Sequence, residues 1–157
     1  MAPSEQLEQY LQTNDIPYLM RHHPPAMTAR QLAEMEHINP HEVAKVVIMK
    51  DHQQFYMMVL PADYKLDLNA VREVLDSREA WIASEQELQQ LFPECELGAM
   101  PPFGEMYQMQ TYAEMDLNDD TEIEFNAGSH EDAIRMRYKH WEQMAHPKMG
   151  HFSYKYH

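Results

Sequence analysis

The hydrophobic and polar positions of this chain predict short strands mixed with helices. The clearest predicted strand is Val43–Met49, an apolar run rich in β-branched residues with Lys45 in its middle. Side chains alternate between the two faces of a strand, and here both faces are apolar, which predicts a strand covered on both sides. Taken alone, Lys45 is most simply an edge-strand lysine whose ammonium reaches water. The alternative is a lysine at the mouth of a cleft that meets an anionic ligand.

The same pattern predicts the other elements. Short apolar runs indicate strands at 16–20, 55–60, 80–83, 107–115, 122–126 and 133–136. Periodic apolar positions and capping residues indicate helices at 4–12, 29–36, 68–75, 85–92 and 138–144, with Ser4, Thr28, Asp67 and Ser84 as caps. Residues 127–130 read as a turn, and the polar and aromatic tail 148–157 as loosely held. Because strands and helices intermix without strict alternation, we expect an α/β fold of mixed α+β character.

Length and composition narrow the class of protein. A chain of 157 residues fits one domain, 1–157, and no apolar run reaches the roughly 18–20 residues that span a bilayer. The N-terminus lacks the basic and apolar regions of a secretory signal. A lone cysteine, Cys95, permits no internal disulfide. We therefore expect a cytoplasmic protein that does not contact membranes, and a monomer.

The charge excludes one class of function. The formal net charge is −14, and only 12 residues are Lys or Arg. A protein that grips an extended nucleic-acid backbone needs many cations against phosphates. Recognition of a nucleic-acid end, where two or three cations suffice, stays open.

Three of the four glycines lie in two predicted loops. Gly98 and Gly104 bracket a segment with two prolines, and Gly128 lies two residues before His130. Tight turns are the simple explanation. A segment stiffened by prolines can also present backbone N–H groups to a carbonyl oxygen or an oxyanion without an ordering cost.

Other catalytic chemistries find little support. Cys95 lies between acidic residues, which should raise the pKa of its thiol, and the chain has no Gly-x-Ser-x-Gly motif. The ten histidines show no recognised metal-ligand spacing; His37 and His41 are four apart but Pro40 intervenes. Phosphate-binding glycine motifs are absent. We expect no metal and no cofactor.

Three motifs in order resemble the YbaK family of editing domains associated with prolyl-tRNA synthetase, which includes free-standing trans-editing proteins. They are Val43-Ala44-Lys45-Val46-Val47, Gly98-Ala99-Met100-Pro101-Pro102-Phe103-Gly104 and Phe125-Asn126-Ala127-Gly128-Ser129-His130. Residues 23–29 and 60–63 also look like this family. The similarity runs from about Tyr18 to Met144.

The resemblance implies a YbaK-like fold, with a mixed, mostly antiparallel sheet and surrounding helices, and hydrolysis of amino acids wrongly attached to tRNA. Water attacks the ester and no protein nucleophile is used. Lys45 and His130 are then the expected catalytic residues. The substrate-binding residues implied are Gly98, Ala99, Met100, Pro101, Pro102, Phe103, Gly128 and Ser129. The expected partners are the acceptor end of an aminoacyl-tRNA and a synthetase or elongation factor that holds the tRNA.

Two positions depart from the family's common pattern. Pro101 stands where many members carry a small or hydroxyl residue, so the loop loses an N–H group and stiffens. Val46 stands where many carry a small polar residue. Both bear on which amino acid is removed. The alternative is a non-catalytic binding module of the same fold for a tRNA end, a small ligand or a protein; a metal-dependent hydrolase ranks last.

Overall fold

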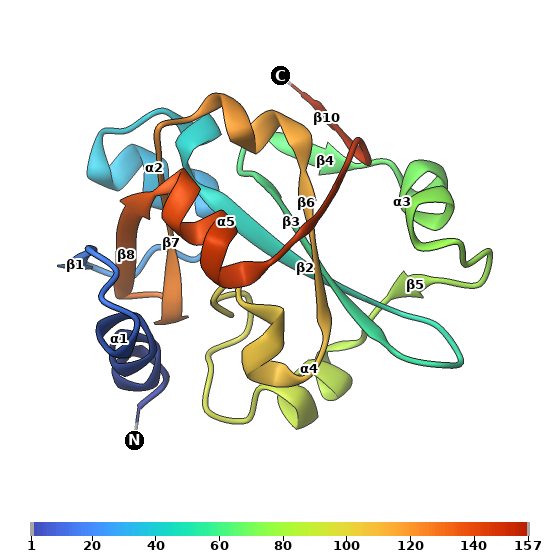
Figure 1. The fold of residues 1–157 in the computed structure, drawn as a ribbon, viewed down its shortest axis with the longest axis horizontal. Helices are drawn as coiled ribbons and strands as arrows, with labels where there is room; N and C mark the ends of the chain where they lie inside the picture. Colours follow the sequence, from blue (N-terminus) through green and yellow to red (C-terminus); the bar gives the residue numbers. More distant parts are fainter. Residues whose placement is uncertain (1, 157) are drawn as a thin grey trace.

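The computed structural model describes residues 2–156, which form five α-helices and ten strands (Figure 1). The helices are α1 (Pro3–Thr13), α2 (Ala29–Glu36), α3 (Leu68–Leu75), α4 (Glu85–Leu91) and α5 (Tyr138–Ala145). The strands are β1 (Leu19–His22), β2 (Ala44–Lys50), β3 (Phe55–Pro61), β4 (Tyr64–Leu66), β5 (Trp81–Ile82), β6 (Gln110–Glu114), β7 (Glu122–Ser129), β8 (Asp132–Arg137), β9 (Lys148–Gly150) and β10 (Ser153–Lys155). Three 3₁₀ turns, η1 (Pro40–Glu42), η2 (Gly104–Tyr107) and η3 (Met115–Asp119), complete the order.

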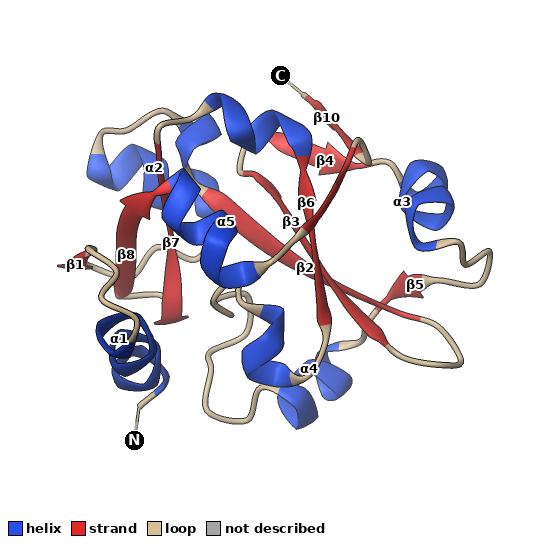
Figure 2. Ribbon diagram, viewed as in Figure 1, coloured by secondary structure: helices blue, strands red, loops and turns tan. Residues whose placement is uncertain are grey.

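The strands form three sheets, and helices lie around them (Figure 2). The largest sheet has the order β5-β2-β3-β6-β9. In it β2 pairs antiparallel with β3, while β3–β6 and β6–β9 are parallel. A second sheet, β1-β8-β7, and the pair β10-β4 are antiparallel. The expected mixed, mostly antiparallel α/β fold is confirmed.

Strand β2 is covered on both faces, as its sequence predicts. Ala44 and Ile48 belong to the larger hydrophobic cluster, which also contains Trp141. Met49, on the opposite face, belongs to a second cluster with Phe152. Full burial of a side chain such as Ile48 or Met49 stabilises the folded state by about 1.5–3 kcal/mol. Packing against both clusters therefore fixes the position of β2.

Capping residues set the helix boundaries. Asp67 accepts hydrogen bonds from the first amides of α3, and Ser84 and Glu87 form a capping box at α4. Thr28 caps α2 as predicted, but the side chain of Gln31 accepts from the amide of Met27. Within residues 2–156, no helix is long and apolar enough to cross a membrane.

Three predicted boundaries are wrong. Helix α1 begins at Pro3, after Ala2, and not at a Ser4 cap, because proline is suited to the first helical position. The strand predicted at 16–20 lies at 19–22, where it pairs with β8. The strand predicted from Tyr107 begins at Gln110, because η2 takes up the preceding residues.

The turn predicted at 127–130 is also wrong, since β7 continues through Ser129. The register between β7 and β8 shifts between Asn126 and Ser129, and Gly128 takes φ +101° there. At a β-bulge, one strand carries extra residues and a glycine takes positive φ, and the antiparallel pairing continues beyond it. The reversal comes at His130–Glu131 instead.

The prediction that the tail is loosely held is wrong, and this correction has a larger consequence. Residues 148–150 and 153–155 form β9 and β10, and Phe152 between them is fully buried. The carboxylate of Glu114 holds this segment, because its Oε1 accepts from the amides of Phe152 and Ser153 at 3.0 Å each and from the hydroxyl of Ser153 at 2.7 Å. The tail therefore belongs to the folded core.

Candidate functional site

Lys45 is the second residue of β2, opposite Leu60 of β3, so it lies near the start of the strand. Its ammonium donates to the carbonyl oxygen of Ala62 at 3.3 Å. Burial lowers the pKa of Lys45, while the neighbouring Asp63 raises it. The side chain is half-buried, so it does not extend freely into solvent.

The ring of Tyr156 covers this lysine. The Lys45 ammonium lies 5.7 Å from the ring centroid, the Lys65 ammonium 4.7 Å and the Arg30 guanidinium 5.3 Å. We call these three cations around Tyr156 the cation cluster. Tyr156 follows β10 directly, and its amide donates to the carbonyl oxygen of Asp63 at 3.1 Å. The tail thereby brings an aromatic ring onto the residue that the sequence singles out.

The glycine–proline loop and the end of β7 form one hydrogen-bonded unit. The amide of Gly128 donates to the carbonyl oxygen of Ala99 at 2.9 Å, and the amide of Glu96 donates to the carbonyl oxygen of Gly128 at 2.9 Å. We call residues 96–104 together with 126–130 the loop corner. The structure thus brings together the second and third motifs of the sequence.

Two glycines of the loop corner have positive φ. Gly98 takes φ +84° and Gly128 takes φ +101°, a region that other residues adopt only under strain. A Cβ on Gly128 would also lie 2.4 Å from the Cβ of Pro3 in α1. The predicted need for special backbone geometry is confirmed at both positions.

His130 is buried at the loop corner, with 4% of its surface exposed. Its Nε2 lies 2.6 Å from the carbonyl oxygen of Leu97, and its Nδ1 lies 3.2 Å from the carbonyl oxygen of Ala26. Its amide donates to the carboxylate of Glu96 at 3.1 Å. Both ring nitrogens of His130 thus face protein carbonyl groups. A neutral imidazole has one N–H donor and can donate to one of them, whereas the imidazolium can donate to both.

Ser129 serves the reversal between β7 and β8. Its hydroxyl donates to the carboxylate of Asp132 at 2.8 Å and accepts from the amides of Glu131 and Asp132. The hydroxyl is thus engaged with its own turn.

Two backbone N–H groups of the loop lack a hydrogen-bond partner among residues 2–156. Within residues 2–156, the amides of Gly98 and Met100 have no hydrogen-bond partner, whereas Ala99 and Phe103 donate to loop carbonyls. Pro101 and Pro102 have no N–H. The carbonyl oxygen of Pro102 accepts from the indole of Trp141 at 2.9 Å, which fixes the loop to α5. A rigid loop with two free amides can bind a carbonyl oxygen.

Lys45 and His130 each contact a backbone carbonyl group of one small buried cluster. Lys45 donates to Ala62, and His130 contacts the carbonyl of Ala26; both alanines are fully buried members of that cluster. The hydrogen bond of Lys45 goes to neither Pro102 nor His130. Val43, two residues before Lys45, also bridges to Glu124 of β7, which joins β2 to the strand that carries Gly128.

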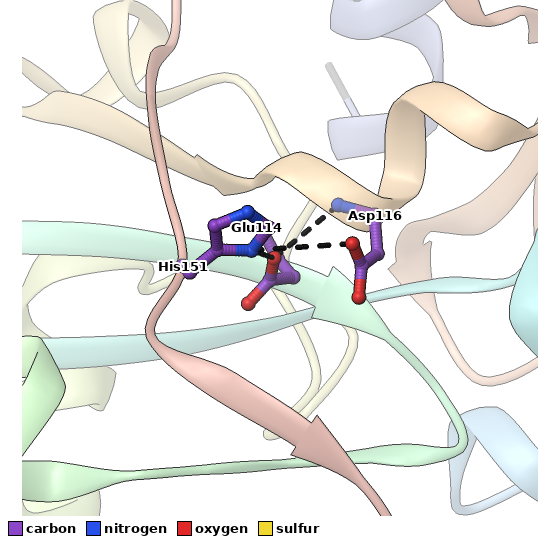
Figure 3. A group of neighbouring side chains, drawn as sticks. All are labelled: Glu114, Asp116 and His151. Carbon is purple, nitrogen blue, oxygen red and sulfur yellow. Dashed lines mark hydrogen bonds and ion pairs between the residues drawn. The ribbon is translucent and has the colours of Figure 1, made fainter.

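A histidine and two carboxylates, missed in the sequence, meet at the start of the tail (Figure 3). The ligand atoms of Glu114, Asp116 and His151 lie within 4.8 Å of one another. Glu114 is fully buried, and both its carboxylate oxygens accept hydrogen bonds. Oε1 accepts from the tail, and Oε2 accepts from the amide of Asp116 at 3.2 Å and from Nδ1 of His151 at 3.0 Å. We therefore assign this trio to holding the tail. His151 lies 37 residues after Glu114, so the sequence shows no ligand spacing for the three.

Cys95 is half-buried, with its sulfur 3.7 Å from the hydroxyl of Tyr107. Burial raises the pKa of its thiol, and Glu94 adds to the rise. The predicted direction is confirmed, with burial as the larger cause.

Comparison with known proteins points to one family. A model described as "Aminoacyl-tRNA editing domain" matches residues 23–144. No curated protein matches. Among solved structures, one described as "a putative trans-editing enzyme for prolyl tRNA synthetase" is 16% identical, covers 98% of each chain and has a TM-score of 0.85. A structure described as a hypothetical protein is also 16% identical, covers 94% of this chain and 99% of its own, and has a TM-score of 0.86.

Proposed function

Because the chain belongs to the aminoacyl-tRNA editing domain family, we propose that it is a deacylase that hydrolyses the ester of mischarged aminoacyl-tRNA in trans. The observation that carries the proposal is the loop corner. It joins two distant motifs through backbone hydrogen bonds and leaves the amides of Gly98 and Met100 without partners within residues 2–156. The resemblance puts the aminoacyl group at this loop.

The chemistry needs no protein nucleophile. A water oxygen attacks the ester carbonyl carbon, and the carbonyl oxygen becomes an oxyanion that the amides of Gly98 and Met100 stabilise. The bond to the ribose oxygen then breaks, that oxygen takes the proton that the attacking water has lost, and the amino acid leaves as its free acid. An aminoacyl ester is already reactive, so positioning the water and stabilising the oxyanion supply the catalysis. The raised pKa of Cys95 is consistent with a thiol that plays no part.

Lys45 and His130 take different roles in this proposal. The Lys45 ammonium provides a positive charge for the oxyanion or for a phosphate near the terminal adenosine. His130 acts as a positioning residue, because both its ring nitrogens face backbone carbonyl groups and it holds Leu97, the residue before Gly98. Pro101 sets the width of the aminoacyl pocket, and a synthetase or elongation factor supplies the rest of the grip on tRNA.

One observation favours a second candidate, a binding module without turnover. Residues 99–104 are buried and Tyr156 covers Lys45, so the site is closed in the free protein. A binding module would retain an aminoacylated tRNA end and release it unchanged.

A panel of mischarged tRNAs, including alanyl-tRNA(Pro), tests the proposal. We expect hydrolysis of at least one member, and a loss of about 100-fold or more in Lys45→Ala, because an interaction made in the transition state is removed. Lys50→Ala is the matched control, since Lys50 lies on the same strand and pairs with Glu87 instead. No hydrolysis across the panel, or full activity in Lys45→Ala, would contradict the proposal, and retention without turnover would support the binding module.

A further inference from the structure

The cation cluster concentrates positive charge on an acidic protein. Four of the 12 Lys and Arg residues lie at Tyr156: Arg30, Lys45 and Lys65 around its ring, and Lys155 as its chain neighbour. The formal net charge of the whole chain is −14. Cations gathered on a protein with this excess of carboxylates require an explanation.

The three cations of the cluster lack carboxylate partners. Among residues 2–156, Arg30, Lys45 and Lys65 form no ion pair within 4.0 Å, whereas Arg21, Lys50 and Arg135 all do. An aromatic face attracts a cation more weakly than a phosphate does, since a charged acceptor forms the stronger, charge-assisted hydrogen bonds. The cluster is therefore a site with unused capacity for an anion.

Asp63 adds a second and independent feature. It is 6% exposed, and within the described residues its Oδ1 is buried without a hydrogen-bond donor. Its Oδ2 lies 3.9 Å from the Lys155 ammonium. A buried carboxylate oxygen without a donor is costly, and the hydroxyl of a ligand would satisfy it. A phosphate and a hydroxyl side by side are the chemistry of a nucleotide.

We propose that Arg30 and Lys65, beside Lys45, form a subsite for a phosphate of the single-stranded tRNA end, that Asp63 accepts from a ribose hydroxyl there, and that Tyr156 covers the subsite in the free protein. The inference rests on the proposed function for the identity of its ligand. It assigns residues outside the three sequence motifs, on α2, on β4 and after β10.

The cover can open without unfolding the tail. Glu114 holds the chain at Phe152 and Ser153, and the last ladder pair is Lys155 with Tyr64. Beyond that pair, Tyr156 keeps one backbone hydrogen bond, to Asp63. The hydrogen bond from Arg30 lowers the pKa of Tyr156, so the phenol oxygen lies beside the Arg30 guanidinium. Release of this one residue uncovers all three cations.

Binding of an acceptor-stem minihelix RNA with a single-stranded CCA end tests the subsite at several salt concentrations. Arg30→Ala/Lys65→Ala should bind about tenfold or more weakly, and the slope of log Kd against log salt should fall by about 0.7 for each phosphate that the variant no longer neutralises. Lys139→Ala, which removes an exposed cation from α5, should leave the slope unchanged. Equal slopes in the double variant and the wild type would overturn the subsite.

The cover has its own readout. Tyr156→Ala should bind the minihelix about three- to tenfold more tightly, because the ring no longer competes, and weaker binding would overturn the covering role. Asp63→Ala, which removes the accepting oxygen, should weaken binding of the CCA minihelix more than binding of a minihelix that ends in 2′-deoxyadenosine or of one that ends in 3′-deoxyadenosine. An equal loss on the hydroxyl-bearing and deoxy ends would overturn the role of Asp63.

Deacylation separates this inference from the proposed function. The double variant should raise KM for the mischarged tRNA while hydrolysing 2′(3′)-O-alanyl adenosine, which has no phosphate, as the wild type does. If no ester is hydrolysed but the RNA affinity still depends on Arg30 and Lys65, the proposed function fails and the subsite stands. If esters are hydrolysed but RNA affinity is the same without Arg30 and Lys65, the proposed function stands and the subsite fails.

Discussion

The loop corner and the cation cluster are held together in opposite ways. Backbone hydrogen bonds and two positive-φ glycines build the loop corner, so its geometry is set without mobile side chains. The cation cluster rests on contacts of an aromatic ring with long, flexible cations. The difference teaches that the loop corner is rigid through its own backbone, while the cation cluster depends on side chains that can rearrange.

The largest expected effect breaks the loop corner. Gly128→Ala should lower the free energy of unfolding by about 3 kcal/mol, because alanine is strained at φ +101° and its Cβ would meet Pro3 at 2.4 Å. Urea unfolding of the variant measures the change.

Gly150→Ala is the matched control for that substitution. Its added Cβ would lie 3.3 Å from the nearest atom, a flexible Val74 methyl, so its cost should stay below about 1 kcal/mol. Equal losses in the two variants would show that the strain at Gly128 is absent.

The next effect concerns Glu114, which holds the tail that carries Tyr156 onto the cation cluster. Glu114→Gln should cost about 2 kcal/mol, because an amide nitrogen replaces one of two oxygens that accept from Phe152, Ser153, Asp116 and His151. Hydrogen exchange at the amides of Phe152 and Ser153 should speed up accordingly. Asp119→Asn, which changes an exposed carboxylate on the 3₁₀ turn that follows Glu114, should leave exchange as it is. Slow exchange in Glu114→Gln would disprove the role of Glu114 in holding the tail.

A third effect concerns the strand that links the two regions. Glu124 is fully buried in β7, 3.2 Å from Nε of Arg21 and 3.8 Å from Nη1 of Arg135. Burial, with the charge of Glu36, raises the pKa of Glu124 from 4.5 to about 7 despite these arginines.

The sign of the pH dependence follows from that raised pKa. A carboxyl that binds its proton more tightly when folded stabilises the protein fully below about pH 4.5, and this contribution is lost as the pH rises through 7. Relative to Glu124→Gln, the wild type should therefore lose about 2–3 kcal/mol over that interval. Urea unfolding of both proteins at several pH values measures it, and parallel profiles would contradict the shift.

The smallest effect sharpens the comparison. Tyr156→Leu should change the free energy of unfolding by less than about 1 kcal/mol, because exposed cation–π contacts contribute little. Urea unfolding checks this against Tyr64→Phe, which removes a hydrogen bond to Asp116 in the same pair of strands. A larger loss for Tyr156→Leu would mean that the ring is a structural anchor and not a removable cover.

Local signals in the sequence predicted much of the fold. The caps of α2, α3 and α4 and the strands β2 and β3 depend on residues close together in the sequence, and these predictions are confirmed. The tail could not be predicted in the same way. Its order depends on the carboxylate of Glu114, 38 residues before Phe152, and no local pattern encodes that contact.

The candidate site divides along the same line. The glycines and prolines of the loop corner carry their geometry in their own chemistry, so the sequence indicated them. Arg30, Lys65 and Tyr156 are ordinary surface residue types that become a cluster only through tertiary folding. The roles of Lys45 and His130 in catalysis remain predictions, now with defined contacts for each.

The contact between Pro3 and Gly128 has a practical consequence for handling the protein. Residue 3 touches the loop corner and residue 156 touches the cation cluster, so each end of the described chain lies on a different region. An extension attached before residue 3 would therefore start beside the loop corner, and one attached after residue 156 would start beside the cation cluster. Comparing the two extended forms would test the loop corner and the cation cluster separately, without substituting a residue.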